Sequence, residues 1–180
     1  MLSPALILLD RDGVLNVEGE GGWVTSPEAW VWMPGALDGL RRLGAGRRLM
    51  VVTNQSCVGR GLVSRAQVDA LHAWVIAEAR REGVVLEQIF VCPHAPDDGC
   101  ACRKPAPGNL TAALARAGVP PNEALFVGDS ATDAAAAAAA CVRFVLVRTG
   151  KGRATEAELE GVWAVDDLGV LAASLDLGHL

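Results

Sequence analysis

The sequence changes from apolar to charged within the stretch Ala5-Leu6-Ile7-Leu8-Leu9-Asp10-Arg11-Asp12-Gly13. A short strand that is apolar at every position is buried on both faces, as in a parallel sheet covered by helices. Ligands of such sheets bind where the carboxyl ends of the strands open into a crevice. We therefore expect Asp10 and Asp12 to lie at the edge of a binding site.

Short apolar runs alternate with helical patterns along the rest of the chain. Strands are predicted over residues 5–9, 49–53, 88–92, 124–127 and 143–147, with a sixth candidate over 162–165. Helices are predicted over residues 34–43, 64–81, 107–117 and 133–141. This alternation predicts an α/β fold, a doubly wound (Rossmann-like) parallel sheet with helices on both faces. The intervening segments are short, so we expect a single domain over residues 1–180 without a cap domain.

Composition and charge exclude several classes of partner. Of the 180 residues, 51% are hydrophobic and 21% charged, which predicts a folded protein rather than a disordered one. The net charge of −5 disfavours binding to nucleic acid or to an anionic membrane. The chain shows neither a signal peptide nor an apolar run of about 20 residues that could span a bilayer. We expect a cytoplasmic monomer that acts on a small molecule.

Polar residues follow several of the predicted strands, and together they suggest phosphoryl transfer. The carboxylates of Asp10, Asp12 and Asp129 could surround Mg²⁺, which prefers a few carboxylates with water and phosphate oxygens. One carboxylate can attack phosphorus, and a second one two residues further can exchange a proton with the leaving alcohol and with water. Thr53 and Lys104 could stabilise the oxygens of the transferring group.

Four motifs carry a resemblance to a known family. The stretch from Leu8 to Asn16 resembles the first signature of the haloacid dehalogenase superfamily of phosphatases, and the other three signatures are matched by residues 52–56, 103–105 and 127–133. Within it, the sequence is most similar to the heptose 1,7-bisphosphate 7-phosphatases and the histidinol-phosphate phosphatases.

The resemblance implies a role for each residue of the motifs. Asp10 would be the nucleophile and Asp12 the general acid/base. Mg²⁺ would be held by Asp10, Asp129 and the main-chain carbonyl of Asp12. Thr53 and Lys104 would stabilise the phosphoryl group. The substrate would be contacted by Asn54, Gln55, Ser56 and Arg103. Asp133 is either a supporting residue or a capping acid in the first turn of its helix.

A second cluster lies in residues 92–102 and combines Cys92, His94, Cys100 and Cys102. Three thiolates and one imidazole form a tetrahedral Zn²⁺ set without an open position, so the metal would be structural. The alternative, buried core cysteines, fits poorly because the segment is rich in Pro, Asp and Gly. The zinc would fix the loop that presents Arg103 and Lys104, and the resembled subfamily has the same pattern at this place.

The predicted function is removal of the 7-phosphate from D-glycero-D-manno-heptose 1,7-bisphosphate through an aspartyl-phosphate. Hydrolysis of histidinol phosphate or of small phosphomonoesters in general is the alternative within the same chemistry. A receiver-like domain that only accepts phosphate would explain neither the Asp10–Asp12 spacing nor the zinc set, and the acidic charge disfavours a nucleic-acid 3′-phosphatase. Ser130 stands where the resembled enzymes have Lys or Arg, which leaves the substrate and its anomer open.

A few residues outside these motifs have open or structural roles. Trp23, Trp30 and Trp32 follow the first strand and could form a flap over the substrate or pack in the core. We expect Cys57 and Cys141 to be small buried side chains. His72 is expected to be structural or solvated.

Overall fold

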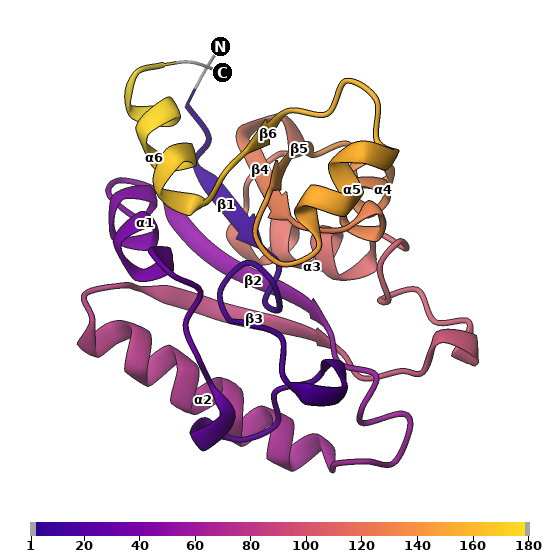
Figure 1. The fold of residues 1–180 in the computed structure, drawn as a ribbon. Helices are drawn as coiled ribbons and strands as arrows, with labels where there is room; N and C mark the ends of the chain where they lie inside the picture. The colour runs from indigo at the N-terminus through magenta and orange to yellow at the C-terminus, as the bar shows by residue number, and fades with distance from the viewer. Residues whose placement is uncertain (1–2, 179–180) are drawn as a thin grey trace.

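The computed structural model describes residues 3–178, which form one six-stranded sheet flanked by helices (Figure 1). The strands are β1 (Leu6–Leu9), β2 (Arg48–Asn54), β3 (Leu86–Cys92), β4 (Ala124–Gly128), β5 (Arg143–Val147) and β6 (Ala164–Val165). The helices are α1 (Ala36–Leu43), α2 (Arg65–Arg81), α3 (Gly108–Ala117), α4 (Ala131–Ala139), α5 (Gly152–Glu158) and α6 (Leu168–Asp176). All strand pairs are parallel, in the order β3-β2-β1-β4-β5-β6. The predicted doubly wound single-domain fold is confirmed.

Strand β1 lies inside the sheet and contributes side chains to both hydrophobic cores. Ile7 and Leu9 belong to the core that includes residues of α1, α2 and α6. Leu6 and Leu8 point the other way, into the core that includes residues of α3 and α4. Successive side chains of a strand point to opposite faces, so an all-apolar β1 requires a cover on both sides.

The helix boundaries follow local sequence signals. Helix α2 begins after Ser64, which forms the predicted capping box with Gln67. Helix α3 ends at Gly118, whose φ of +66° gives the left-handed conformation common at helix ends. Helix α1 begins two residues later than predicted, because Gly35 at its N-cap has a φ of +77°.

Two helices, α5 and α6, were not predicted. Helix α6 carries a start signal in Asp167, whose side chain accepts a hydrogen bond from the backbone N–H of Val170. Helix α5 has seven residues, no side-chain cap and few buried positions, so its periodicity is weak.

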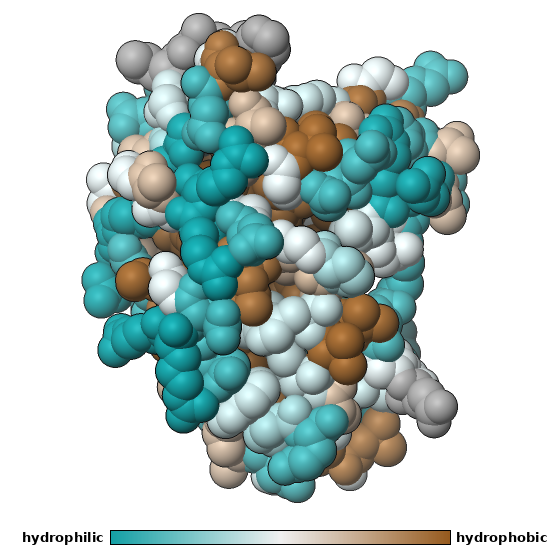
Figure 2. Space-filling model, turned by 60° about the vertical axis from the view of Figure 1, so that its left-hand side comes forward, coloured by the Kyte–Doolittle hydropathy of each residue, from teal (hydrophilic) through white to brown (hydrophobic). Residues whose placement is uncertain are grey.

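The surface is mixed in polarity. Figure 2 shows small apolar patches scattered among polar side chains on the face it presents. Among the helices of residues 3–178, none combines the length and the apolar character that crossing a membrane needs. Cys57 is buried as predicted, but the prediction for Cys141 was wrong: this thiol is exposed, and its residue has a φ of +58° just after α4.

Candidate active site

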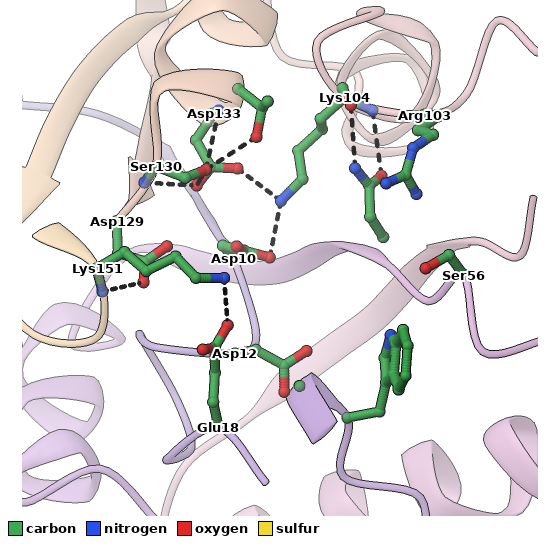
Figure 3. A pocket seen from close by; sticks show the side chains of 14 residues that line it. Asp10, Asp12, Glu18, Ser56, Arg103, Lys104, Asp129, Ser130, Asp133 and Lys151 are labelled. Atoms are coloured by element: carbon green, nitrogen blue, oxygen red, sulfur yellow. Dashed lines mark hydrogen bonds and ion pairs between the residues drawn. The ribbon is translucent and has the colours of Figure 1, made fainter. Parts of the chain in front are cut away.

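The site lies where the direction of the chain crossovers reverses, between the neighbouring strands β1 and β4. Asp10 follows β1, and Asp129 follows β4. Crossovers from β1 lead to β2 and β3 on one side, while β4, β5 and β6 lie on the other. Such a switch point leaves a crevice at the carboxyl ends of the strands. Figure 3 shows the acidic and basic side chains that gather there.

Three carboxylates crowd together in this crevice. Asp10, Asp129 and Asp133 each offer an oxygen within 4.8 Å of the other two. Burial, with the charges of Asp133 and Asp129 adding to it, raises the pKa of Asp10 to about 8 despite the opposing charge of Lys104. Burial also raises the pKa of Asp129 to about 6. The cluster therefore holds more negative charge than its own protein neighbours neutralise, which fits a site for a hard divalent cation.

Lys104 is the cation that the protein itself supplies to the cluster. Its Nζ lies 2.7 Å from Asp10 Oδ1, 2.7 Å from Asp133 Oδ1 and 3.1 Å from the carbonyl oxygen of Val52. Although burial opposes its charged form, the two carboxylates raise the pKa of Lys104 above its ordinary value. Lys104 is therefore a fixed positive charge beside the predicted nucleophile.

Asp129 sits between two glycines. A Cβ added to Gly13 would lie 2.0 Å from Asp129 Oδ2, and one added to Gly150 would lie 2.1 Å from the same atom. Both glycines also have positive φ angles, +81° and +55°. The backbone N–H of Lys151 donates a hydrogen bond of 2.8 Å to Asp129 Oδ2. The loops after β1 and β5 thus close around this carboxylate at a distance that only glycine permits.

The carboxylate of Asp12, which the residues alone suggested as a metal ligand, lies outside the cluster formed by Asp10, Asp129 and Asp133. Its Oδ1 accepts hydrogen bonds from Arg11 and Asn16, and its Oδ2 accepts one from Gln55. Although burial opposes it, the Arg11 cation together with these hydrogen bonds lowers the pKa of Asp12. Asp133 takes the third position in the cluster. Coordination through the main-chain carbonyl of Asp12, as the family resemblance implies, stays a prediction.

The residues predicted to contact substrate have different surroundings. Asn54, Ser56 and Arg103 line the pocket. The side chain of Asn54 also clamps the backbone of Lys104, donating to its carbonyl and accepting from its N–H. Gln55 is fully buried, and its amide donates to both Asp12 and Thr53. A role of Gln55 in substrate binding stays a prediction, as do those of the other three.

The pocket has a volume of about 210 Å³ and carries an excess of acid. Five carboxylates and three cationic side chains line it: Asp10, Asp12, Glu18, Asp129 and Asp133, with Arg103, Lys104 and Lys151. A phosphate dianion would be repelled by this balance unless a divalent cation entered with it. Glu18 and Lys151, which form an ion pair of 2.5 Å across the pocket, were not predicted as site residues. Both residues lie outside the four motifs and 133 positions apart in the chain, so no local signal indicates that they would face each other.

Ser130 and Asp133 form the start of helix α4. The Ser130 hydroxyl and backbone N–H both donate to Asp133 Oδ2, and the hydroxyl accepts from the Asp133 N–H in turn. Asp133 is therefore a capping acid, which was one of the two roles predicted for it. It is fully buried and paired with Lys104 rather than solvated. Ser130 lines the pocket and brings no positive charge to it.

The tryptophans after β1 divide between the two predicted roles. Trp30 is buried and packs edge-on against Trp32 and Trp74. Trp23 instead lines the pocket, where the guanidinium of Arg60 lies 5.8 Å from the centroid of its ring. The flap hypothesis therefore concerns Trp23 alone.

The four predicted zinc ligands lie together in the loop after β3. Cys92 Sγ is 3.6 Å from both His94 Nδ1 and Cys100 Sγ, while Cys102 Sγ is 3.2 Å from His94 Nδ1 and 3.6 Å from Cys100 Sγ. Tetrahedral zinc with ordinary Zn–S and Zn–N bonds would separate its ligand atoms by about 3.5–3.8 Å. The donor set and its spacing fit zinc, and no cystine bridge joins these thiols within residues 3–178.

The class of protein follows from the sheet and the site together. A doubly wound sheet with an Asp-x-Asp pair after an inner strand, and a buried lysine beside the first aspartate, is the arrangement expected of the haloacid dehalogenase-like (HAD) phosphatases. The HAD-hydrolase-like family model matches residues 101–171.

Individual relatives narrow this class. D-glycero-beta-D-manno-heptose-1,7-bisphosphate 7-phosphatase of Bordetella bronchiseptica is 42% identical over 179 residues, covering 94% of this chain and 97% of its own. The corresponding alpha-anomer enzyme of Mycobacterium tuberculosis is 36% identical and covers 87% of each chain. The crystal structure of the B. bronchiseptica heptose bisphosphate phosphatase complexed with magnesium and phosphate superposes with a TM-score of 0.89, covering 96% of this chain and 98% of that one at 41% identity. The chain therefore belongs to the HAD-like phosphatases, and it is similar to these heptose-1,7-bisphosphate 7-phosphatases over nearly its full length.

Proposed function

We propose that this protein is a magnesium-dependent phosphatase that removes the 7-phosphate of D-glycero-D-manno-heptose 1,7-bisphosphate. The pocket supports the reaction, because it combines buried carboxylates with one fixed cation. The similarity to the named relatives over nearly the full length of both chains is the observation that carries the choice of substrate.

Magnesium would be held by the carboxylates of Asp10 and Asp129 and by the main-chain carbonyl of Asp12. The bound ion would offset the acid excess of the pocket, favour the ionised form of Asp10 and neutralise charge on the phosphate. The solved relative was crystallised with magnesium and phosphate, which supports the same cation here.

Asp10 then acts as the nucleophile toward phosphorus. Its Oδ1 is held by Lys104 Nζ and by the backbone N–H of Arg11, both at 2.7 Å, so the orientation of the carboxylate is set before substrate binds. Lys104 would also stabilise the equatorial oxygens during transfer. Because the pKa of Asp12 is lowered, its carboxylate would first have to take up a proton from solvent or from the substrate phosphate. It would then give this proton to the departing sugar oxygen and later take one from the water that hydrolyses the aspartyl-phosphate.

A panel of substrates with Mg²⁺ present tests the proposal. It would include both anomers of the heptose bisphosphate, histidinol phosphate and several hexose phosphates. We expect kcat/KM for one heptose bisphosphate anomer to exceed that of every other compound by about 100-fold or more. Equal, weak turnover of all compounds would contradict the assignment and favour a general phosphomonoesterase.

The proposal extends to the zinc site, the cellular location and the oligomeric state of the protein. We infer that Cys92, His94, Cys100 and Cys102 bind a structural zinc ion, since four protein ligands leave no position for substrate. A thiolate site of this kind suits a reducing compartment, which agrees with a cytoplasmic location. We also expect a monomer, which light scattering of the purified protein would check.

A further inference from the structure

Arg11 is a buried cation next to the catalytic residues, and no step of the phosphoryl transfer described above uses it. Its side chain is completely buried. Its Nη2 donates to Asp12 Oδ1 at 2.8 Å and to the carbonyl oxygen of Val24 at 3.2 Å. Its guanidinium carbon lies 5.7 Å from the centroid of the Trp30 ring, within the range of a cation–π contact. Burying a charge is unfavourable unless it is paired, so this set of contacts has a structural or functional purpose.

The partner of Arg11 inside the site is the carboxylate of Asp12. Arg11 and Asn16 occupy Oδ1 of that carboxylate at 2.8 and 2.9 Å, and Gln55 occupies Oδ2 at 2.8 Å. Three donors on two oxygens leave the carboxylate little freedom to rotate. Proton transfer to a leaving oxygen depends on such alignment, and a misplacement of about 1 Å can reduce a rate by about 100-fold.

The fourth contact of Arg11 comes from a distant element. His72, on helix α2, places Nε2 3.0 Å from Arg11 Nη1, 61 positions away in sequence. A guanidinium can only donate, so Nε2 of His72 must accept, and the ring carries its single proton on Nδ1. Burial, reinforced by the Arg11 cation, lowers the pKa of His72 to about 3, so the ring is neutral at physiological pH. Within residues 3–178, the buried Nδ1 has no hydrogen-bond partner, so Arg11 is the polar contact that accounts for the place of this ring.

We propose that His72 is a positioning residue of the phosphatase, which holds Arg11 so that Arg11 in turn aims the carboxylate of Asp12 at the leaving-group oxygen. The path is continuous, from α2 through two side chains to the loop after β1. The inference rests on the proposed function, in which Asp12 is the proton donor. It assigns a part in the reaction to helix α2, which contributes no residue to the lining of the pocket.

Two substitutions separate this role from simple packing. His72→Leu fills a similar volume but cannot accept a hydrogen bond from Arg11. His72→Gln places an amide oxygen where Nε2 was and can accept it. Val75→Ala is the matched control, because Val75 is buried on the same helix and forms part of the apolar core. It should lower stability without changing the selectivity between substrates.

The readout is kcat/KM for two substrates that differ in the leaving group. The alcohol that leaves a sugar phosphate needs a proton on its departing oxygen. The p-nitrophenolate that leaves p-nitrophenyl phosphate is a stable anion, so its departure depends little on proton donation by Asp12. For His72→Leu we expect kcat/KM to fall by about 10- to 100-fold on the heptose bisphosphate and by less than about 3-fold on p-nitrophenyl phosphate. This ratio reports the transfer to Asp10, in which the two leaving groups differ, and not the later hydrolysis of the aspartyl-phosphate, which both substrates share. His72→Gln should recover most of the loss. Asp12→Asn should show the same selectivity with a larger loss.

The outcomes distinguish this inference from the proposed function. If kcat/KM of His72→Leu falls equally on both substrates, or on neither, or if His72→Gln recovers nothing, the positioning role is wrong. If kcat/KM of Asp12→Asn itself falls equally on both substrates, or the unmodified enzyme releases no phosphate from sugar phosphates, the proposed function fails instead.

Discussion

At the scale of single residues, Asp129 depends on the absence of two side chains. Its Oδ2 lies so close to Gly13 and Gly150 that a Cβ on either one would overlap with it. A carboxylate held this tightly has a fixed orientation, which favours a ligand for a cation with strict geometry such as Mg²⁺.

Gly13→Ala should therefore weaken Mg²⁺ binding and reduce turnover by about 100-fold or more, because the new methyl group displaces Asp129 and the φ of +81° disfavours alanine. Gly118→Ala is the control, with a φ of +66° and no atom within 4 Å of its added Cβ. It should cost about 1 kcal/mol of stability and leave turnover unchanged. Mg²⁺ titrations of turnover and thermal melts would measure both. Near-normal activity in Gly13→Ala would show that Asp129 tolerates displacement.

At the scale of elements, helix α2 is joined to the site by one neutral, buried histidine. The pKa of His72 is lowered from 6.5 to about 3, first by burial and then by Arg11. The unfolded chain therefore binds a proton at a higher pH than the folded one does. Neutral His72 therefore contributes to the free energy of unfolding in full above pH 6.5, and this contribution is lost as the pH falls from 6.5 toward 3.

Comparing the free energies of unfolding of the native protein and His72→Gln across this range isolates the contribution of His72. The free energy of unfolding of the native protein, relative to that of His72→Gln, should fall by roughly 3–5 kcal/mol between pH 6.5 and pH 3, because glutamine does not titrate. Denaturant melts at several pH values would give the difference. A difference that stays constant with pH would mean that His72 titrates alike in the folded and unfolded chains.

The loop after β3 is a second element that supports the active site. Its cluster is linked to the active site by adjacent residues, since Arg103 follows Cys102 and donates to the carbonyl oxygen of His94 at 3.4 Å. Lys104 comes next, with its backbone clamped by Asn54.

Cys100→Ser should lower the zinc content, reduce the melting temperature and weaken turnover through a displaced Lys104. Cys141→Ser is the matched control, because Cys141 is exposed and lies outside the cluster. Metal analysis by mass spectrometry and thermal melts would measure both variants. Unchanged zinc content and stability in Cys100→Ser would refute a structural zinc site.

At the scale of the whole molecule, the sequence predicted most of the framework. Buried strands such as β1 and β5 were found because nearly every position in them is apolar, and α2 because Ser64 and Gln67 mark its start. The strand ends placed Asp10 and Asp129 together, since neighbouring parallel strands share an edge.

What could not be predicted depends on contacts between distant segments. The ion pair of Glu18 with Lys151 and the contact of His72 with Arg11 join positions 133 and 61 residues apart. The surroundings of Asp12 and Asp133 also depend on distant partners, because Gln55 binds the carboxylate of Asp12 and Lys104 binds that of Asp133. Arg11, Asn16 and Ser130 are close in sequence to the carboxylates that they bind, but no local pattern encodes the contacts with Gln55 and Lys104.

The role of Asp10 as the nucleophile is tested by the single substitution Asp10→Asn. The substitution keeps the shape of the side chain and removes the charged oxygen that would attack phosphorus. With Mg²⁺ and the preferred sugar phosphate, we predict that turnover falls by at least about 10⁴-fold while the melting temperature is retained. Phosphate release by Asp10→Asn at a rate near that of the native enzyme would contradict this role.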